Sequence, residues 1–170
     1  MVARTVALFG ANLLLYGIMQ GLNNALTPFG LSLYFGGLFI AFPTLVLPPL
    51  NALIVILLSA FLIDAPLLIP FGSSALLFTV GFYLATLAER RMHYSLRTLT
   101  TTIAFTLNLG LFLCISFIAP DTRFSNPNQL QTLAINLALS QALILALSSW
   151  FLSFQQLLLY WANATNKARS

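Results

Sequence analysis

Residues 98–118 read TLTTTIAFTLNLGLFLCISFI and contain no charged side chain. A helix needs about 20 predominantly apolar residues to cross the roughly 30 Å of hydrocarbon in a bilayer, so this run predicts a transmembrane helix. The whole chain has the same character, because 59% of its 170 residues are hydrophobic and 6% are charged. Soluble domains contain about 25% charged residues. The composition therefore predicts an integral membrane protein.

The small number of charged side chains excludes several classes of protein. The chain has seven Lys or Arg and three Asp or Glu, with a net charge of +4, which is too few to build a water-exposed shell. A disordered chain, a secreted disulfide scaffold, a nucleic-acid-binding protein and a cytosolic enzyme are excluded on this ground. The single cysteine, Cys114, cannot form a disulfide within the chain. We attribute the excess of positive charge to orientation in the membrane.

Six apolar segments are separated by residues that break helices. Pro28 and Pro49 each follow the end of an apolar run, and proline removes a backbone donor and restricts the residue before it. Residues 65–72 read as a turn at a membrane surface, and residues 120–131 form a hydrophilic loop. We expect an all-α fold with a single membrane domain and six transmembrane helices, at 6–26, 31–47, 50–63, 73–88, 98–118 and 132–161.

The third segment is the shortest, since a helix over 50–63 rises only about 21 Å. It is a short span, extends past Asp64, or returns to the side from which it came. The basic residues favour a third segment that crosses the membrane. With six spans only Arg123 of the seven basic residues lies outside, whereas with five spans the basic residues are divided less unequally between the two sides. Both termini are then cytoplasmic. The basic residues expected on the cytoplasmic side are Arg4, Arg90, Arg91, Arg97, Lys167 and Arg169.

The first segment divides into three faces when its residues are placed at 100° intervals. Its leucine face is expected to contact lipid, and its glycine stripe is expected to pack closely against a neighbouring helix. Its polar face is expected in the bundle interior, either in interhelical hydrogen bonds or lining a ligand pocket. The leucine face contains Leu8, Leu15, Ile18, Leu22 and Leu26, the glycine stripe Gly10, Gly17 and Gly21, and the polar face Asn12, Tyr16, Gln20, Asn23 and Thr27.

Uncharged polar residues also recur along the last two segments. Proton and ion pathways usually place an ionisable residue within a span, and neither segment has one near its middle. Coupling of transport to an ion is therefore disfavoured, whereas binding of a neutral solute stays open. These polar residues are Thr101 and Asn108 in the fifth segment, and Asn136, Ser140, Gln141, Ser148 and Gln155 in the sixth.

The acids and bases form no recognisable catalytic or metal-binding pattern. Asp64 and Asp121 are both expected outside, but nothing in the sequence brings them together. The chain has no HExxH, CxxC or Walker motif. We expect no enzymatic activity, no metal and no cofactor. Glu89 and His93 fall at a helix end beside a cytoplasmic basic loop, which sets topology or contacts anionic lipid; its basic residues are Arg90, Arg91 and Arg97.

One stretch of the sequence points to a particular protein family, which the composition alone cannot do. An apolar helix ends in Asp64, Gly72 follows after seven intervening residues with Pro70 two positions before it, and the next apolar helix leads into the basic loop. This pattern resembles the bacterial rod shape-determining protein family MreD, in which a helix of the form Gly-Leu-Leu-x-Asp precedes a turn ending near Pro-Leu-Gly. Residues 50–97 carry the resemblance. The chain departs from it at 59–60, where the family often has glycine, and at Phe71.

The resemblance implies a non-catalytic component of the machinery that elongates the peptidoglycan wall, in the bacterial inner membrane. It implies a single-span scaffold of the MreC type as partner and a link to the actin-like MreB. Asp64 would then end the third helix at the outer interface, because a carboxylate at mid-bilayer costs roughly 2.5–3.5 kcal/mol. The reversal would involve Pro66, Pro70 and Gly72, with a stabilising role and a partner-binding role both open.

The alternative is the substrate-binding membrane subunit of an energy-coupling-factor vitamin transporter, which the chain resembles more weakly. Such subunits are similar in size, have six helices and use alanine-spaced motifs against a coupling subunit. Ala3, Ala7 and Ala11 have that spacing here. In this alternative an external pocket for a small neutral vitamin would be lined by Asn23, Asn24, Thr27 and Tyr34.

Overall fold

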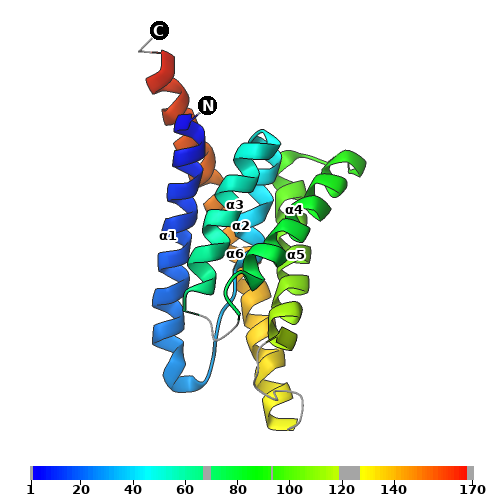
Figure 1. Ribbon diagram of the computed structural model, residues 1–170. Coiled ribbons are helices and arrows are strands. Elements are labelled where there is room, and N and C mark those ends of the chain that lie inside the picture. Colours follow the sequence, from blue (N-terminus) through cyan, green and yellow to red (C-terminus); the bar gives the residue numbers. More distant parts are fainter. Residues whose placement is uncertain (1, 67–69, 93, 119–126, 168–170) are drawn as a thin grey trace.

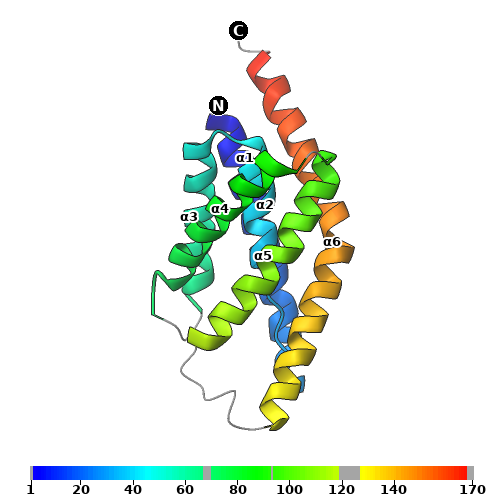
Figure 2. The ribbon, with the colours of Figure 1, turned by 90° about the vertical axis from the view of Figure 1, so that its right-hand side faces the viewer.

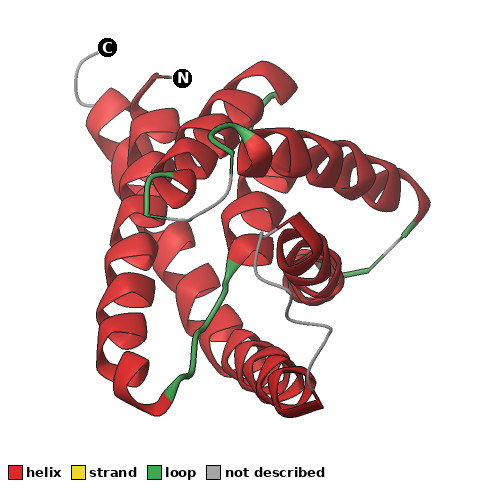
Figure 3. Ribbon diagram, turned by 60° about the horizontal axis from the view of Figure 1, so that its bottom comes forward, coloured by secondary structure: helices red, strands yellow, loops and turns green. Residues whose placement is uncertain are grey.

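The protein is a bundle of helices (Figure 1). The computed structural model describes residues 2–66, 70–92, 94–118 and 127–167. These residues contain helix and loop but no strand (Figure 3), which confirms the all-α expectation for the described part of the chain. The helices are α1 (Val2–Leu26), α2 (Gly36–Val46), α3 (Pro49–Asp64), α4 (Ser73–Arg91), α5 (Leu96–Ile118) and α6 (Pro127–Lys167), with a 3-10 turn η1 (Thr27–Phe29) after α1.

Three stretches of the described residues are long and apolar enough to cross a membrane: Val2–Phe29, Leu96–Ile118 and Gln129–Ala162. Helices α2 and α3 are apolar but shorter. An 11-residue helix such as α2 is only about 16 Å long, roughly half the thickness of the hydrocarbon layer. The apolar helices are those of a membrane-embedded protein, while the count of six crossings stays a prediction.

Helix α2 occupies the centre of the bundle. Every residue from Gly36 to Thr44 is buried, and α2 packs against α3, α4, α5 and α6. Its sequence is apolar all round, as expected of a helix surrounded by protein. A Cβ atom added to Gly37 would lie 1.9 Å from the backbone oxygen of Ala104 on α5. Glycine therefore allows the two backbones to touch at this position.

Helix α2 begins later than the sequence predicts. The second apolar segment was expected to be helical from residue 31, but residues 31–35 are non-helical and the helix begins at Gly36. In Figures 1 and 2 this segment runs back into the bundle beside α1. The difference arises because an apolar run gives no information about the polar side chains that bind the backbone of 31–35.

The bundle has two distinct ends (Figures 1 and 2). Helix α1 begins, α6 ends, and α4 connects to α5 at one end, which we call the terminal end. The 3-10 turn η1, the end of α3 and the start of α4 lie at the other, which we call the turn end.

Candidate functional site

Asp64 is the last residue of α3 and lies buried at the turn end, with 3% of its surface exposed. Its Oδ2 accepts a hydrogen bond of 2.7 Å from the backbone N–H of Gly72, and its Oδ1 accepts one of 3.0 Å from the N–H of Ser74. The first N–H groups of a helix have no partner within it, and a negative charge there is favourable. Asp64 therefore caps α4 from the end of the preceding helix.

The remaining residues of the predicted reversal lie in the same connection. Gly72 has a φ of 95°, a left-handed conformation that favours glycine, and it directly precedes α4. The N–H and Oγ of Ser73 both donate to the carbonyl oxygen of Pro70, at 3.1 and 2.7 Å. Pro66 follows the end of α3 and is exposed. Residues 67–69 of the reversal lie outside the described residues.

Two aromatic rings lie on the surface of this connection. Phe71 is 72% exposed and Phe61 on α3 is 40% exposed. Their rings stack, with centroids 5.5 Å apart and planes at 15°. We call this pair the Phe61–Phe71 patch. It places an exposed apolar surface directly beside the buried carboxylate, where it can contact lipid or another membrane protein.

The polar face of α1 points inward and binds the chain itself. Asn12 is 1% exposed, and its Nδ2 donates to the Oγ of Ser59 on α3 at 2.9 Å and to the carbonyl of Phe39 on α2 at 3.2 Å. Tyr16 and Gln20 on the same face are half-buried. Asn12 thus joins three helices, which is the interhelical role expected of this face rather than that of a pocket.

Two asparagines hold the non-helical segment 31–35. Asn23 pairs with the backbone of Leu33: its Oδ1 accepts from the N–H at 2.6 Å and its Nδ2 donates to the carbonyl at 3.0 Å. Asn136 on α6 accepts from the N–H of Ser32 at 3.2 Å and donates to its Oγ at 3.1 Å. Non-helical backbone within a membrane protein has to be satisfied by protein groups or water. These amides provide the partners.

The same pattern continues to the start of α2. Ser140 on α6 accepts a hydrogen bond of 3.1 Å from the N–H of Tyr34, and the Oδ1 of Asn108 on α5 accepts one of 3.3 Å from the N–H of Gly37. Ser140 and Asn108 therefore bind a backbone segment that lies 106 and 71 positions away from them in the chain. Asn108, Ser140 and Tyr34 were singled out from the sequence, Tyr34 as a residue lining a pocket, whereas Gly37 was missed; the Gly36-Gly37 pair was the available signal.

The prediction for the glycine stripe of α1 was wrong within this chain. A Cβ atom added to Gly10, Gly17 or Gly21 would meet nothing within 4 Å, so these glycines allow no close helix contact here. The prediction that the leucine face contacts lipid was wrong for Leu8 and Leu15, which are buried. Lipid and a protein core are equally apolar, so leucine spacing alone does not tell which side of a membrane helix faces inward.

The basic loop lies at the terminal end. Arg90 and Arg91 occupy the last turn of α4, where positive charge is favourable for the helix dipole, and both are exposed. Arg97 near the start of α5 is exposed and donates a hydrogen bond to the Oγ of Ser149 on α6. The terminal end therefore carries exposed charges, in contrast to the buried carboxylate of the turn end.

The described residues include no group of three or more His, Cys, Asp or Glu side chains able to hold a metal ion. The predictions that concern His93 and Asp121 fall outside the described residues. Comparison with known proteins found no matching family model, no matching curated protein and no matching solved structure. Any functional assignment therefore depends on the chain's own residues.

Proposed function

We propose that the protein is a non-catalytic membrane component of the machinery that elongates the cell wall in a rod-shaped bacterium. It would reside in the inner membrane, bind a single-span scaffold of the MreC type and be linked through it to MreB. The observation that carries the proposal is the pair of hydrogen bonds that Asp64 accepts from the N–H groups of Gly72 and Ser74.

Those bonds give a physical purpose to the motif on which the resemblance to MreD depends. The motif pairs an aspartate at a helix end with a glycine eight positions later, and here the carboxylate binds that glycine's N–H. Its buried position at a helix junction supports a structural role for the carboxylate. The polar groups of α1, α5 and α6 described above also bind backbone and neighbouring helices, as in a structural subunit.

The proposal includes six crossings with both termini in the cytoplasm. Its support is that α1 begins and α6 ends at the end of the bundle that also carries Arg90, Arg91 and Arg97, because basic loops favour the cytoplasmic side. The turn end would then face outward. A C-terminal reporter should be active only if its enzyme works in the cytoplasm, and activity of a reporter that works only outside would contradict this topology.

The Phe61–Phe71 patch is the surface that we assign to the single-span partner. It is apolar and exposed and lies beside Gly72, whose N–H donates to the Asp64 carboxylate, so a partner helix would meet an apolar surface next to the start of α4. The exposed Leu84 on α4 provides a matched control outside this patch. Purification of the tagged protein should retain an MreC-type partner for the wild type and for Leu84→Ala, and lose most of it for Phe71→Ala combined with Phe61→Ala. Equal retention in all three would contradict the assignment.

The vitamin-transporter alternative is not proposed. Two of the residues expected to line its pocket bind the chain itself, since Asn23 pairs with Leu33 and the Oγ1 of Thr27 donates to the carbonyl of Asn23.

A further inference from the structure

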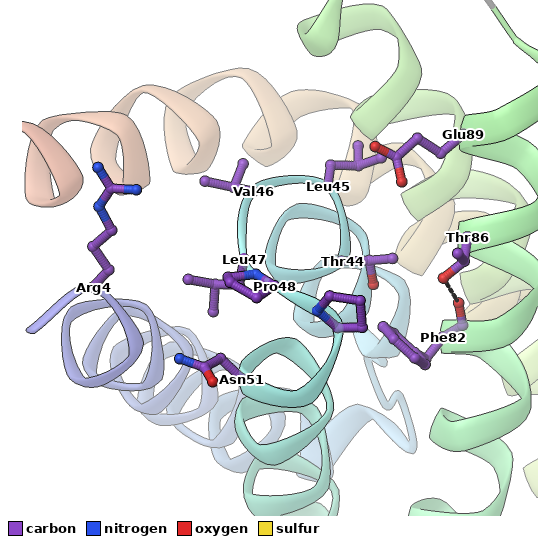
Figure 4. A pocket seen from close by; sticks show the side chains of 11 residues that line it. Arg4, Thr44, Leu45, Val46, Leu47, Pro48, Asn51, Phe82, Thr86 and Glu89 are labelled. Carbon is purple, nitrogen blue, oxygen red and sulfur yellow. Dashed lines mark hydrogen bonds between the residues drawn. The ribbon is translucent and has the colours of Figure 1, made fainter. Parts of the chain in front are cut away.

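A pocket of about 400 Å³ opens at the terminal end of the bundle, between α1, the connection from α2 to α3, and α4 (Figure 4). It lies far along the bundle from the Asp64 turn and has no part in the proposed function. In Figure 4, Arg4 and Asn51 lie on one side, Thr86 and Glu89 lie on the other, and the α2–α3 connection lies between them. Its volume falls in the range of small-molecule sites.

The two sides of the pocket have opposite polarity. Arg4 carries the positive charge of one side, and the N-terminus of α3 opens beside it at Pro48 and Asn51. Pro48 and Pro49 have no N–H and helix α3 has no side-chain cap, so the N–H groups of Leu50 and Asn51 add positive potential where an anion would bind. Arg4 has an interaction within the chain, and its guanidinium has five N–H donors to share between that interaction and a ligand.

The opposite side favours a cation. Glu89 supplies a carboxylate in the last turn of α4, and Thr44 brings the C-terminal part of α2 to the same pocket. Helix C-termini carry partial negative charge, which adds to the charge of the carboxylate. The basic Arg90 and Arg91 follow it in the chain but do not line the pocket. A cation bound in the pocket would be attracted by both the carboxylate and the helix end.

Apolar side chains separate the two sides. Leu45, Val46, Leu47 and Phe82 line the pocket together with the polar groups. A ligand that fits this arrangement carries an anionic group and an ammonium group on a short linker, and the apolar lining accommodates carbon atoms between or beside them. A simple anion would meet the repulsion of Glu89, and a simple cation would meet that of Arg4.

We propose that this pocket binds a zwitterionic phosphate ester, with the phosphate on the Arg4 side and a primary ammonium group on the Glu89 side. Two sources share this chemistry: the headgroup of phosphatidylethanolamine in the surrounding bilayer, and free phosphoethanolamine. The pocket is at the end of the bundle expected at the cytoplasmic interface, where both sources are within reach.

The test uses the full chain in detergent, with lipid binding followed by native mass spectrometry. The wild type should bind phosphatidylethanolamine about tenfold more tightly than phosphatidylglycerol or amine-acylated phosphatidylethanolamine, which lack the ammonium group. Equal affinity for all three lipids would overturn the proposal unless free phosphoethanolamine stabilises the wild type. This comparison changes the lipid and not the protein, so its result does not depend on whether a variant folds.

Matched variants locate the site. Glu89→Gln should abolish the preference for the ammonium-bearing ligand, and Arg4→Gln should weaken all the phosphate ligands about tenfold. Arg90→Gln removes a neighbouring charge that does not line the pocket and should change nothing. If Arg90→Gln and Arg4→Gln lose the same affinity for the phosphate ligands, these ligands are attracted to basic residues in general, and the proposal is overturned.

Free phosphoethanolamine distinguishes the sources. Thermal stabilisation of the wild type but not of Glu89→Gln by this compound, without selective lipid binding, assigns the pocket to the free molecule. Selective lipid binding without such stabilisation assigns it to the bilayer lipid. Absence of both effects would overturn the proposal.

Discussion

The two ends of the bundle use charged side chains in opposite ways. At the turn end Asp64 is buried and both carboxylate oxygens accept backbone hydrogen bonds. At the terminal end Arg4, Glu89, Arg90 and Arg91 are exposed. A buried charge with backbone partners determines local structure, whereas exposed charges determine orientation and what binds. Changes to the buried charge of the turn end should therefore affect stability, and changes to the exposed charges of the terminal end should affect ligands and topology.

The largest effect is expected from Asp64→Ala. The substitution leaves the N–H groups of Gly72 and Ser74 without their acceptors, and each unsatisfied buried donor costs about 1–3 kcal/mol. Unfolding in detergent should show a loss of about 3 kcal/mol, together with reduced abundance in the membrane. Asp64→Asn keeps one acceptor oxygen, so its free energy of unfolding should lie between those of the wild type and Asp64→Ala. Wild-type stability and abundance for Asp64→Ala would show that the buried carboxylate is not structural.

The next largest effect is expected at Gly37, where two helix backbones touch, and not at Gly17, where no neighbouring atom lies close. Gly37→Ala should destabilise the protein by about 2 kcal/mol, because the added Cβ would overlap the backbone oxygen of Ala104. Gly17→Ala is the matched control, since nothing lies within 4 Å of its added Cβ. It should leave the free energy of unfolding unchanged or raise it by up to about 1 kcal/mol. Thermal unfolding of both variants distinguishes the positions, and equal losses would contradict the assignment of α2 as the central helix.

A smaller effect tests the support of residues 31–35. Asn23→Ala removes both hydrogen bonds to Leu33, which lie in a partly buried region, and should cost about 1–2 kcal/mol. Asn136→Ala acts on the adjacent Ser32. Because both amides hold one segment, the double variant should show a coupling energy of at least about 0.5 kcal/mol in a double-mutant cycle. Additive losses would indicate that the two amides act independently.

The smallest effect on stability is expected at the terminal end. Arg90→Gln combined with Arg91→Gln should change the free energy of unfolding by less than about 0.5 kcal/mol, because both side chains are exposed. The same change weakens the positive loop and should increase the fraction of chains inserted in the opposite orientation. Reporter fusions at the C-terminus measure that fraction. A stability loss as large as that of Asp64→Ala would remove the distinction between the two ends.

Local chemistry was the most predictable part of the molecule. Asp64 ends a helix and Gly72 precedes one, and both boundaries could be expected from an apolar run, a carboxylate and a helix-breaking turn. The inward position of Asn12 could also be expected, because an amide facing lipid lacks hydrogen-bond partners. Asp64 and Asn12 are polar, and a polar side chain needs hydrogen-bond partners that protein provides and lipid does not.

Long-range packing was not predictable. The break at 31–35 depends on Asn136 and Ser140, more than 100 positions away in the chain. The faces of α1 were misassigned because Leu8 contacts a protein core that is as apolar as lipid. Whether a glycine allows a close helix contact depends on the element packed against it, which the sequence does not show: Gly37 lies against α5, whereas Gly17 has no atom within 4 Å of an added Cβ.

The proposed role in cell-wall elongation is best examined by depleting the protein in its rod-shaped host while cell length and width are followed by microscopy. Depleted cells should widen and become round within a few generations, and wild-type protein should restore rods whereas Asp64→Ala should restore them poorly. If cells keep their rod dimensions after the protein has fallen below detection, the protein has no role in elongation.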